Sequence, residues 1–276
     1  MSDDCTATLP HSTLAPAAML FAILGYGRFG QAFAQLLIHH GHQVRAYDPH
    51  ARVPPDYAAA SAVEAIAGVQ WIVLAMPIAK MGPTLGALLP HLHEAQTVID
   101  VGSVKVHPCS LMDECLGARI AHAGTHPLFG PLSLARGERP LRVVICPSAQ
   151  HLQAAERARE LFVDLGCEVI EQDPESHDRA MAHTHALAFF IAKGLVDIGV
   201  DDGAPVAPPS FQGMKNMLAA VRADAGHLFA TIQRENPFAA EARALLLAEL
   251  ERIHRQLLTE ADDDSMAIPA SFERLP

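Results

Sequence analysis

The chain has 276 residues, a length that suits one large domain or two modest ones. Half of the residues are apolar and 18% are charged, which argues against disorder, and the formal net charge is −11. The sequence contains no basic stripe, so we expect neither a nucleic-acid partner nor a polybasic membrane anchor. Its longest apolar runs fall short of the roughly 20 residues that a membrane-spanning helix needs.

The first residues and the cysteines indicate the cellular compartment. The acidic start, Met1-Ser2-Asp3-Asp4, disfavours a secretory signal, which needs a positively charged start. The five cysteines are odd in number, scattered, and without a C-x-x-C pair. This pattern is typical of reduced thiols rather than of a disulfide framework or a zinc site. We therefore expect a cytoplasmic protein that needs no metal.

Short apolar runs and helical periodicity alternate over residues 18–174, after an aperiodic stretch at 1–17 that predicts a flexible tail. Strands are predicted over 19–24, 43–48, 70–76, 97–101, 141–145 and 168–170. Helices are predicted after the first strand as far as Gly41, near 63–66, and over 149–165. This alternation predicts a doubly wound α/β sheet of the Rossmann type.

The pattern is helical throughout residues 175–260, with a breaker-rich loop at 201–209, and a second tail is expected at 261–276. The last helix carries apolar residues at helical spacing, namely Leu246, Leu250, Ile253 and Leu257. A helical segment this small cannot bury several apolar faces within itself. We therefore expect a homodimer that forms through this helical domain.

Gly25-Tyr26-Gly27-Arg28-Phe29-Gly30 is a G-x-G-x-x-G motif between a predicted strand and a predicted helix. Its glycines permit a tight turn, close approach of a pyrophosphate, and close packing of helix on strand. Asp48 ends the second strand, where an acid accepts a hydrogen bond from the ribose 2′-OH and repels a 2′-phosphate. NAD is therefore expected over NADP, although the nearby Arg52 keeps NADP open. Met76 and Pro77, which end the third strand, are further candidate cofactor contacts.

Two loops are expected at the carboxyl ends of later strands, where ligands of such sheets bind. The first contains Asp100-Val101-Gly102-Ser103-Val104-Lys105, and the second contains Thr125-His126-Pro127-Leu128-Phe129-Gly130-Pro131. Both loops can face the nicotinamide, and Ser103 is a candidate contact to it.

These motifs, followed by His177-Asp178-Arg179, closely resemble the prephenate/arogenate dehydrogenase family in their sequence and order. The resemblance implies a Rossmann-type domain followed by an all-helical dimerisation domain. It also implies NAD(P)-dependent oxidative decarboxylation of prephenate, arogenate or a close analogue, in tyrosine or related aromatic biosynthesis.

The resemblance assigns a role to two residues. His126 corresponds to the base that takes the proton from the ring hydroxyl of the cyclohexadienol substrate, and Ser103 to the serine that hydrogen-bonds nearby. Histidine suits this role because its side chain ordinarily titrates near neutral pH. Aromatisation drives the loss of carbon dioxide, so the protein mainly orients its ligands and supplies one base.

The chain departs from the family where the substrate carboxylate is expected to bind. The family usually carries an arginine early in the second long helix, and Gln212 stands at that position here. Gln212 cannot supply the charged fork of an arginine, and Lys215 is a candidate replacement. In the family, the helix after His177-Asp178 often bears one or two inward histidines, and Ala186 and Phe189 stand at those positions here. His183 and His185 lie nearby but cannot both face one site on a helix, and His185 is the candidate.

Two alternatives stay open from the sequence alone. A β-hydroxyacid dehydrogenase on the same two-domain plan would use Lys193 as its catalytic group, but this hypothesis leaves His126 without a role. A non-catalytic, NAD-binding regulatory protein would explain Gln212, but not the presence of both Ser103 and His126.

Overall fold

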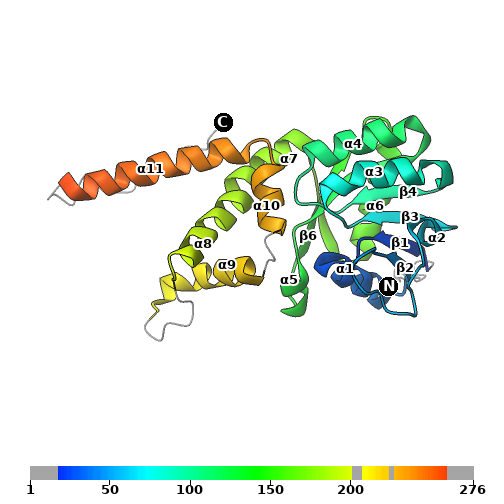
Figure 1. Cartoon of the computed structure of the whole chain (residues 1–276), viewed down its shortest axis with the longest axis horizontal. Coiled ribbons are helices and arrows are strands. Elements are labelled where there is room, and N and C mark those ends of the chain that lie inside the picture. The colour runs from blue at the N-terminus through cyan, green and yellow to red at the C-terminus, as the bar shows by residue number, and fades with distance from the viewer. Residues whose placement is uncertain (1–17, 201–206, 224–226, 260–276) are drawn as a thin grey trace, which may run out of the picture. The chain divides into compact units, whose positions relative to one another are not determined.

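The computed structural model describes residues 18–200, 207–223 and 227–259, so both predicted tails and most of the predicted loop at 201–209 lie outside the described residues. The chain divides after Pro174 into two compact units, Met1–Pro174 and Glu175–Pro276 (Figure 1).

The first unit is built on a seven-stranded sheet with the order β2-β1-β3-β4-β5-β6-β7. The strands are β1 (Leu20–Leu24), β2 (Gln43–Tyr47), β3 (Trp71–Leu74), β4 (Thr97–Asp100), β5 (Ala121–Pro127), β6 (Leu141–Pro147) and β7 (Cys167–Glu171). β1 to β5 pair in parallel, β5 and β6 pair antiparallel, and β6 and β7 are again parallel to each other. The chain leaves β1 in one direction for β2 and then continues on the other side with β3. This reversal is the point at which doubly wound sheets bind their ligands.

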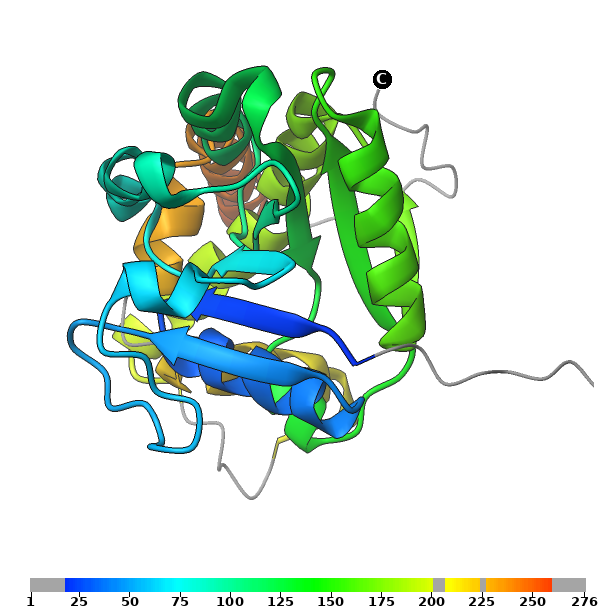
Figure 2. The ribbon, with the colours of Figure 1, turned by 90° about the vertical axis from the view of Figure 1, so that its right-hand side faces the viewer.

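Helices cover both faces of this sheet, as the predicted fold class requires. They are α1 (Arg28–His39), α2 (Ala62–Ile66), α3 (Ile78–Leu88), α4 (Val106–Leu116), α5 (Pro131–Ala135) and α6 (Leu152–Asp164). Successive side chains of a strand point to opposite faces, so the unbroken apolar run of β1 serves two cores. Phe21 and Ile23 pack with α1 and α6, while Ala22 and Leu24 pack with α2, α3 and α4. In Figure 2 the blue helix α1 lies along the blue strands β1 and β2.

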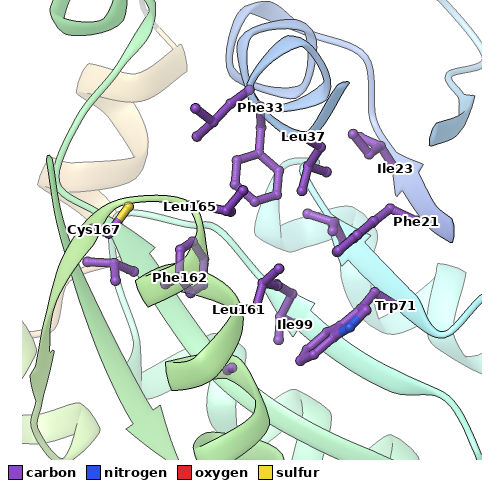
Figure 3. Packing of buried hydrophobic residues seen from close by; sticks show 14 of the residues in the cluster. Phe21, Ile23, Phe33, Leu37, Trp71, Ile99, Leu161, Phe162, Leu165 and Cys167 are labelled. Carbon is purple, nitrogen blue, oxygen red and sulfur yellow. The ribbon is translucent and has the colours of Figure 1, made fainter. Parts of the chain in front are cut away.

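The core between α1, α6 and the sheet is closed by large apolar side chains (Figure 3). Phe33 of α1 meets Phe162 of α6 with 6.1 Å between their ring centroids, and both side chains are fully buried. Burying one such side chain contributes about 1.5–3 kcal/mol to stability. The two helices are thereby fixed on one face, and the turn between β1 and α1 is held at the edge of the sheet.

The sequence analysis missed one strand and therefore misplaced His126, which lies in β5 rather than in a loop. β5 reads Ala-His-Ala-Gly-Thr-His-Pro and lacks the apolar, β-branched composition that marks a strand. It is nevertheless buried from His122 to Pro127, because β4 pairs with it on one side and β6 on the other. Tertiary pairing thus overrides the local propensity of this segment.

The second unit is helical in its described part. It contains α7 (Pro174–Met181), a π-helical turn η3 (Ala182–Ala186), α8 (Leu187–Asp197), η4 (Pro209–Phe211), α9 (Gln212–Ala223), α10 (His227–Arg234) and α11 (Ala239–Thr259). Its buried apolar residues form two small clusters: Ala186, Ile232 and Ala239, and Ala192, Leu218 and Val221. No helix within the described ranges is both long and apolar enough to cross a membrane.

Candidate active site

Two glycines of the turn between β1 and α1 are required by the backbone around them. Gly25 has a φ of +102°, and a Cβ built on it would lie 2.3 Å from the carbonyl oxygen of Ala75, just beyond β3. A Cβ on Gly30 would lie 2.2 Å from the carbonyl oxygen of Gly25. Any side chain at either position would displace backbone, so these glycines allow α1 to begin close against the strands.

Gly27 differs, because a Cβ built on it would meet no atom of the described chain within 4 Å. Its φ of −67° is open to any L-residue, so neither strain nor packing explains a glycine here. Gly27 is the N-cap residue of the twelve-residue helix α1, where backbone N–H groups favour an anion. A side chain would fill the space that a bound pyrophosphate needs, so the turn fits a dinucleotide.

Asp48 follows β2, and its carboxylate hydrogen-bonds both the turn after this strand and the glycine turn. Its Oδ2 accepts a hydrogen bond from the backbone N–H of Tyr26 at 2.7 Å, and its Oδ1 accepts from those of His50 and Ala51 at 2.8 Å each. Partial burial alone would raise the pKa of this carboxyl, but the three backbone N–H groups outweigh it, so the pKa lies below its ordinary value. Asp48 therefore carries a negative charge at neutral pH, beside the glycine turn.

The other predicted cofactor residues lie at the start of α1 and after β3, and they differ in exposure. Phe29 is half-buried, and its ring packs against the protein with its centroid 5.9 Å from that of Phe33 and 6.3 Å from that of Phe129. Arg28 and Pro77 are exposed, and Met76 is half-buried. Met76 and Pro77 come directly after β3, next to the glycine turn, because Ala75 donates its N–H to Leu24 at the end of β1.

Ser103 lies half-buried in the loop between β4 and α4, above a buried ion pair of Asp100 and Lys105. Lys105 Nζ also donates to the carbonyl oxygen of Thr125 in β5, at 2.7 Å. Asp100 Oδ2 accepts from the N–H of Gly102 at 2.9 Å, and Oδ1 accepts from the N–H of Thr125 at 3.2 Å. Asp100 and Lys105 belong to the sequence motif around Ser103, and no role was predicted for either of them. The signal available in the sequence was a pair of opposite charges, five residues apart, at the end of an apolar strand.

His126 stands near the end of β5, where it pairs with Val144 of β6 and is 4% exposed. The carboxyl ends of β1, β3, β4 and β5 meet at one edge of the sheet, because these strands are parallel. The structure therefore brings Gly25, Met76, Ser103 and His126 to the same edge.

The remaining predicted residues belong to the second unit. Gln212 is the exposed first residue of α9, and Lys215 is half-buried one turn later. His185 lies in the π-helical turn, with its ring edge-on to Phe189 at a centroid distance of 4.7 Å. Burial, with a smaller effect of His177, lowers the pKa of His185 to about 4, so the imidazole is neutral near pH 7.

The sequence analysis expected an ordinary helix around His183 and His185, but this segment forms the π-helical turn. Just before it, His177 Nδ1 donates to Asp178 Oδ1 at 2.8 Å, and both side chains are fully buried. Turns of this kind often occur at functional sites.

Comparison with known proteins agrees with these observations. Residues 40–171 match the family described as prephenate dehydrogenase, nucleotide-binding domain. The chain is 25% identical to arogenate dehydrogenase 2 of Arabidopsis thaliana over 262 residues, which cover 87% of this chain and 70% of that protein. It is 26% identical over 192 residues to a probable arogenate/prephenate dehydrogenase of Methanocaldococcus jannaschii, covering 66% of this chain but only 42% of that protein.

A solved structure shares the fold. The crystal structure of prephenate dehydrogenase from A. aeolicus, in complex with hydroxyphenyl propionate and NAD+, superposes with a TM-score of 0.71 at 21% identity. The superposition covers 90% of this chain and 93% of that chain.

Proposed function

Because the chain belongs to the prephenate/arogenate dehydrogenase family, we propose that it oxidatively decarboxylates prephenate, arogenate or a close analogue with a nicotinamide cofactor. Such a reaction serves the biosynthesis of tyrosine or a related aromatic compound. The observation that carries the proposal is the shared edge of the sheet, where the glycine turn, Ser103 and His126 meet.

The glycine turn and Asp48 hold the cofactor in this proposal. The N–H groups at the start of α1 receive the pyrophosphate above Gly27, and Asp48 accepts a hydrogen bond from the adenosine ribose. The charge on Asp48 disfavours a 2′-phosphate, so NAD is the proposed cofactor rather than NADP. When bound, the nicotinamide ring supplies the hydride acceptor.

His126 and Ser103 act on the ring hydroxyl of the substrate. His126 accepts the proton of the substrate hydroxyl while the ring carbon that bears this hydroxyl gives up a hydride. The bond from the opposite ring carbon to its carboxylate breaks and carbon dioxide leaves. The electron pair of that bond completes the aromatic ring, and the ring oxygen takes back the proton held by His126 to give the phenol. Ser103 donates a hydrogen bond beside the hydroxyl and orients it toward His126.

Gln212, Lys215 and His185 are the proposed substrate contacts of the helical unit. A neutral amide at position 212 gives up a charge-assisted hydrogen bond to a carboxylate, which is typically worth about 1.5–3 kcal/mol. Lys215, one turn along α9, supplies a cation in its place. Without this cation, the neutral Gln212 would favour a substrate whose side-chain charge differs from that of prephenate, such as the amino-bearing arogenate.

A homodimer formed through the second unit completes the proposal. α11 exposes leucines that are each between 50% and 73% accessible: Leu245, Leu247, Leu250, Leu257 and Leu258. Apolar surface of this extent on a helix whose own unit has only small buried clusters is typical of a subunit interface. We also place the protein in the cytoplasm, because its described cysteines Cys109, Cys115, Cys146 and Cys167 are all free thiols.

The two alternatives from the sequence are not favoured. Lys193, the catalytic group of a β-hydroxyacid dehydrogenase, donates instead to Asp197 one turn along α8. A non-catalytic regulator would bind NAD but would turn over neither prephenate nor arogenate.

The test is an assay of the purified protein with each pairing of NAD or NADP with prephenate or arogenate, followed by the absorbance of the reduced cofactor. The proposal predicts turnover with NAD and at least one of the two substrates, together with release of carbon dioxide. Cofactor binding without turnover of either substrate would contradict the enzymatic proposal. A strong preference of the wild-type protein for NADP would contradict only the role of Asp48.

A further inference from the structure

The ion pair of Asp100 and Lys105 is buried completely beneath the loop that carries Ser103. The side chain of Lys105 is 0% exposed and that of Asp100 is 1% exposed. The stem of Lys105 runs across β5 at Gly124, where a Cβ would lie 3.4 Å from its Cδ. Gly102 passes closely above the pair, since a Cβ there would lie 3.0 Å from Asp100 Oδ2.

The pair joins three parts of the site. Asp100 belongs to the end of β4, and it holds the loop through the N–H of Gly102, one residue before Ser103. The same carboxylate accepts from the N–H of Thr125, and Lys105 donates to the carbonyl oxygen of Thr125, one residue before His126. The hydroxyl of Thr125 donates in turn to the backbone oxygen of Asp100, at 2.5 Å. Both residues proposed to act on the substrate hydroxyl thus lie one residue from a backbone group that this pair holds.

A contribution to folding stability does not explain well why a buried ion pair is present here. Removing two charges from water costs several kcal/mol per ion, and apolar replacements of similar volume are often neutral or stabilising. A pair of charges that bonds backbone groups on two separate segments does, however, fix their relative position more tightly than apolar contacts can. Small displacements matter at such a site, because an error of 1 Å in a reacting group can reduce the rate by about a hundredfold.

We propose that Asp100 and Lys105 are positioning residues, which fix the Ser103 loop and the His126 strand in the mutual geometry that the reaction needs. The proposal rests on the proposed function, because it is defined by the proton transfer assigned to His126. It predicts a larger effect on turnover than on cofactor affinity, since the glycine turn and Asp48, which are proposed to hold the pyrophosphate and the ribose, lie on other strands.

The test compares three variants, with kcat expressed per site that binds NADH. Lys105→Met removes the cation and leaves Asp100 buried without it, so we expect a lower melting temperature as well as a lower kcat. The double variant Asp100→Asn/Lys105→Met removes both charges, and we expect most of the melting temperature to return. Its kcat is expected to stay at least roughly tenfold below wild type, with a Kd for NADH within about twofold of wild type.

A matched control is present on the same strand. His122, at the other end of β5, is 1% exposed, and its Nε2 lies 2.8 Å from Oδ1 of Asp113, whose side chain is 38% exposed, so it belongs to a half-buried ionisable pair. Asp113→Asn weakens this pair without touching the Ser103 loop. We expect it to lower the melting temperature and to leave kcat per NADH site unchanged.

The outcomes separate the two proposals. If the wild-type protein turns over its substrate and the double variant regains both stability and kcat, the pair is structural and the positioning role is wrong, while the proposed function stands. The same conclusion follows if Asp113→Asn lowers kcat per site as much as the double variant does. If the wild-type protein binds NADH but turns over neither prephenate nor arogenate, the proposed function fails and the positioning role fails with it.

Discussion

At the scale of single residues, the three glycines of the turn after β1 are present for different physical reasons. Gly25 and Gly30 are required by backbone oxygens at 2.3 and 2.2 Å from the Cβ atoms that a substitution would add. No described atom lies within 4 Å of a Cβ built on Gly27, so the space beside it is free for the proposed pyrophosphate. The motif therefore combines two packing requirements with one binding requirement, and substitution can separate them.

We predict that Gly27→Ala leaves the fold intact but weakens NADH binding by at least tenfold, because its methyl group enters the pyrophosphate space. Gly30→Ala, with a Cβ 2.2 Å from a backbone oxygen, should instead lower the melting temperature strongly. Calorimetric titration and thermal unfolding of both variants provide the check. A Gly27→Ala protein with unchanged affinity would remove this turn from the cofactor site.

Asp48 has a structural role beside its proposed binding role, because its carboxylate accepts hydrogen bonds from three backbone N–H groups. Asp48→Ser should weaken NAD binding roughly tenfold to a hundredfold, as expected for the loss of a charge-assisted hydrogen bond, and should narrow the difference between NAD and NADP. Asp56→Asn removes the same charge from an exposed position after β2 and should change neither affinity. Equal losses of NAD affinity in Asp48→Ser and Asp56→Asn would show that the net charge of the protein, and not the position of Asp48, controls NAD binding.

His185 makes the stability of the protein depend on pH in a defined direction. Its pKa in the folded state, about 4, lies below the ordinary value of 6.5, so the unfolded chain takes up the proton first. Stability from this group is full above about pH 6.5 and is lost as the pH falls toward 4, by at most about 1.4 kcal/mol per pH unit. His185→Gln should flatten this part of the pH dependence in urea unfolding, whereas the exposed neighbour His183→Gln should not. An unchanged slope in His185→Gln would contradict the shift.

At the scale of elements, the sequence predicts those strands and helices whose composition agrees with their environment. β1 and β3 are apolar throughout, and the 3.6-residue period of α1 places Phe33 and Leu37 in the core. β5 could not be predicted, because its burial comes from pairing with β4 and β6 and its own residues are small or polar. The π-helical turn at Ala182–Ala186 has no signal in the periodicity either.

The residues of the candidate site were likewise predictable only where a local sequence motif identifies them. The glycine turn, Asp48 and Ser103 were placed by motifs that have a local cause. The contact of Lys105 with Thr125 joins segments 20 residues apart in the chain and could be found only from the structure.

α11 is the element whose surface is least explained by its own unit. We predict that Leu250→Glu combined with Leu257→Glu, two exposed positions two turns apart, converts the proposed dimer to a monomer without loss of helicity. Ala248→Glu adds a charge at another exposed position on the same helix and serves as the control. Light scattering and far-UV circular dichroism give the two readouts. A wild-type protein that is already monomeric would contradict the proposed interface.

At the scale of the whole molecule, the chain divides the work of the proposed reaction between its two units. The first unit gathers the cofactor turn, the Ser103 loop and His126 along one edge of a seven-stranded sheet. The second unit contributes candidate substrate contacts and the proposed subunit interface from helices. The first unit carries the residues proposed to perform the chemistry, and Gln212 of the second unit is proposed to alter the recognition of the substrate. The central claim is that His126 takes the proton of the substrate hydroxyl in an oxidative decarboxylation of the family type.

The most direct test of this claim is the turnover of His126→Ala, with NADH binding measured on the same preparation. Removing a general base typically costs roughly 100- to 10,000-fold in rate, so we predict a loss of that size in kcat with the better of prephenate and arogenate. The Kd for NADH should remain within about twofold of wild type, because the glycine turn is untouched. A His126→Ala protein with near-normal kcat on a substrate that the wild-type enzyme turns over would contradict the account.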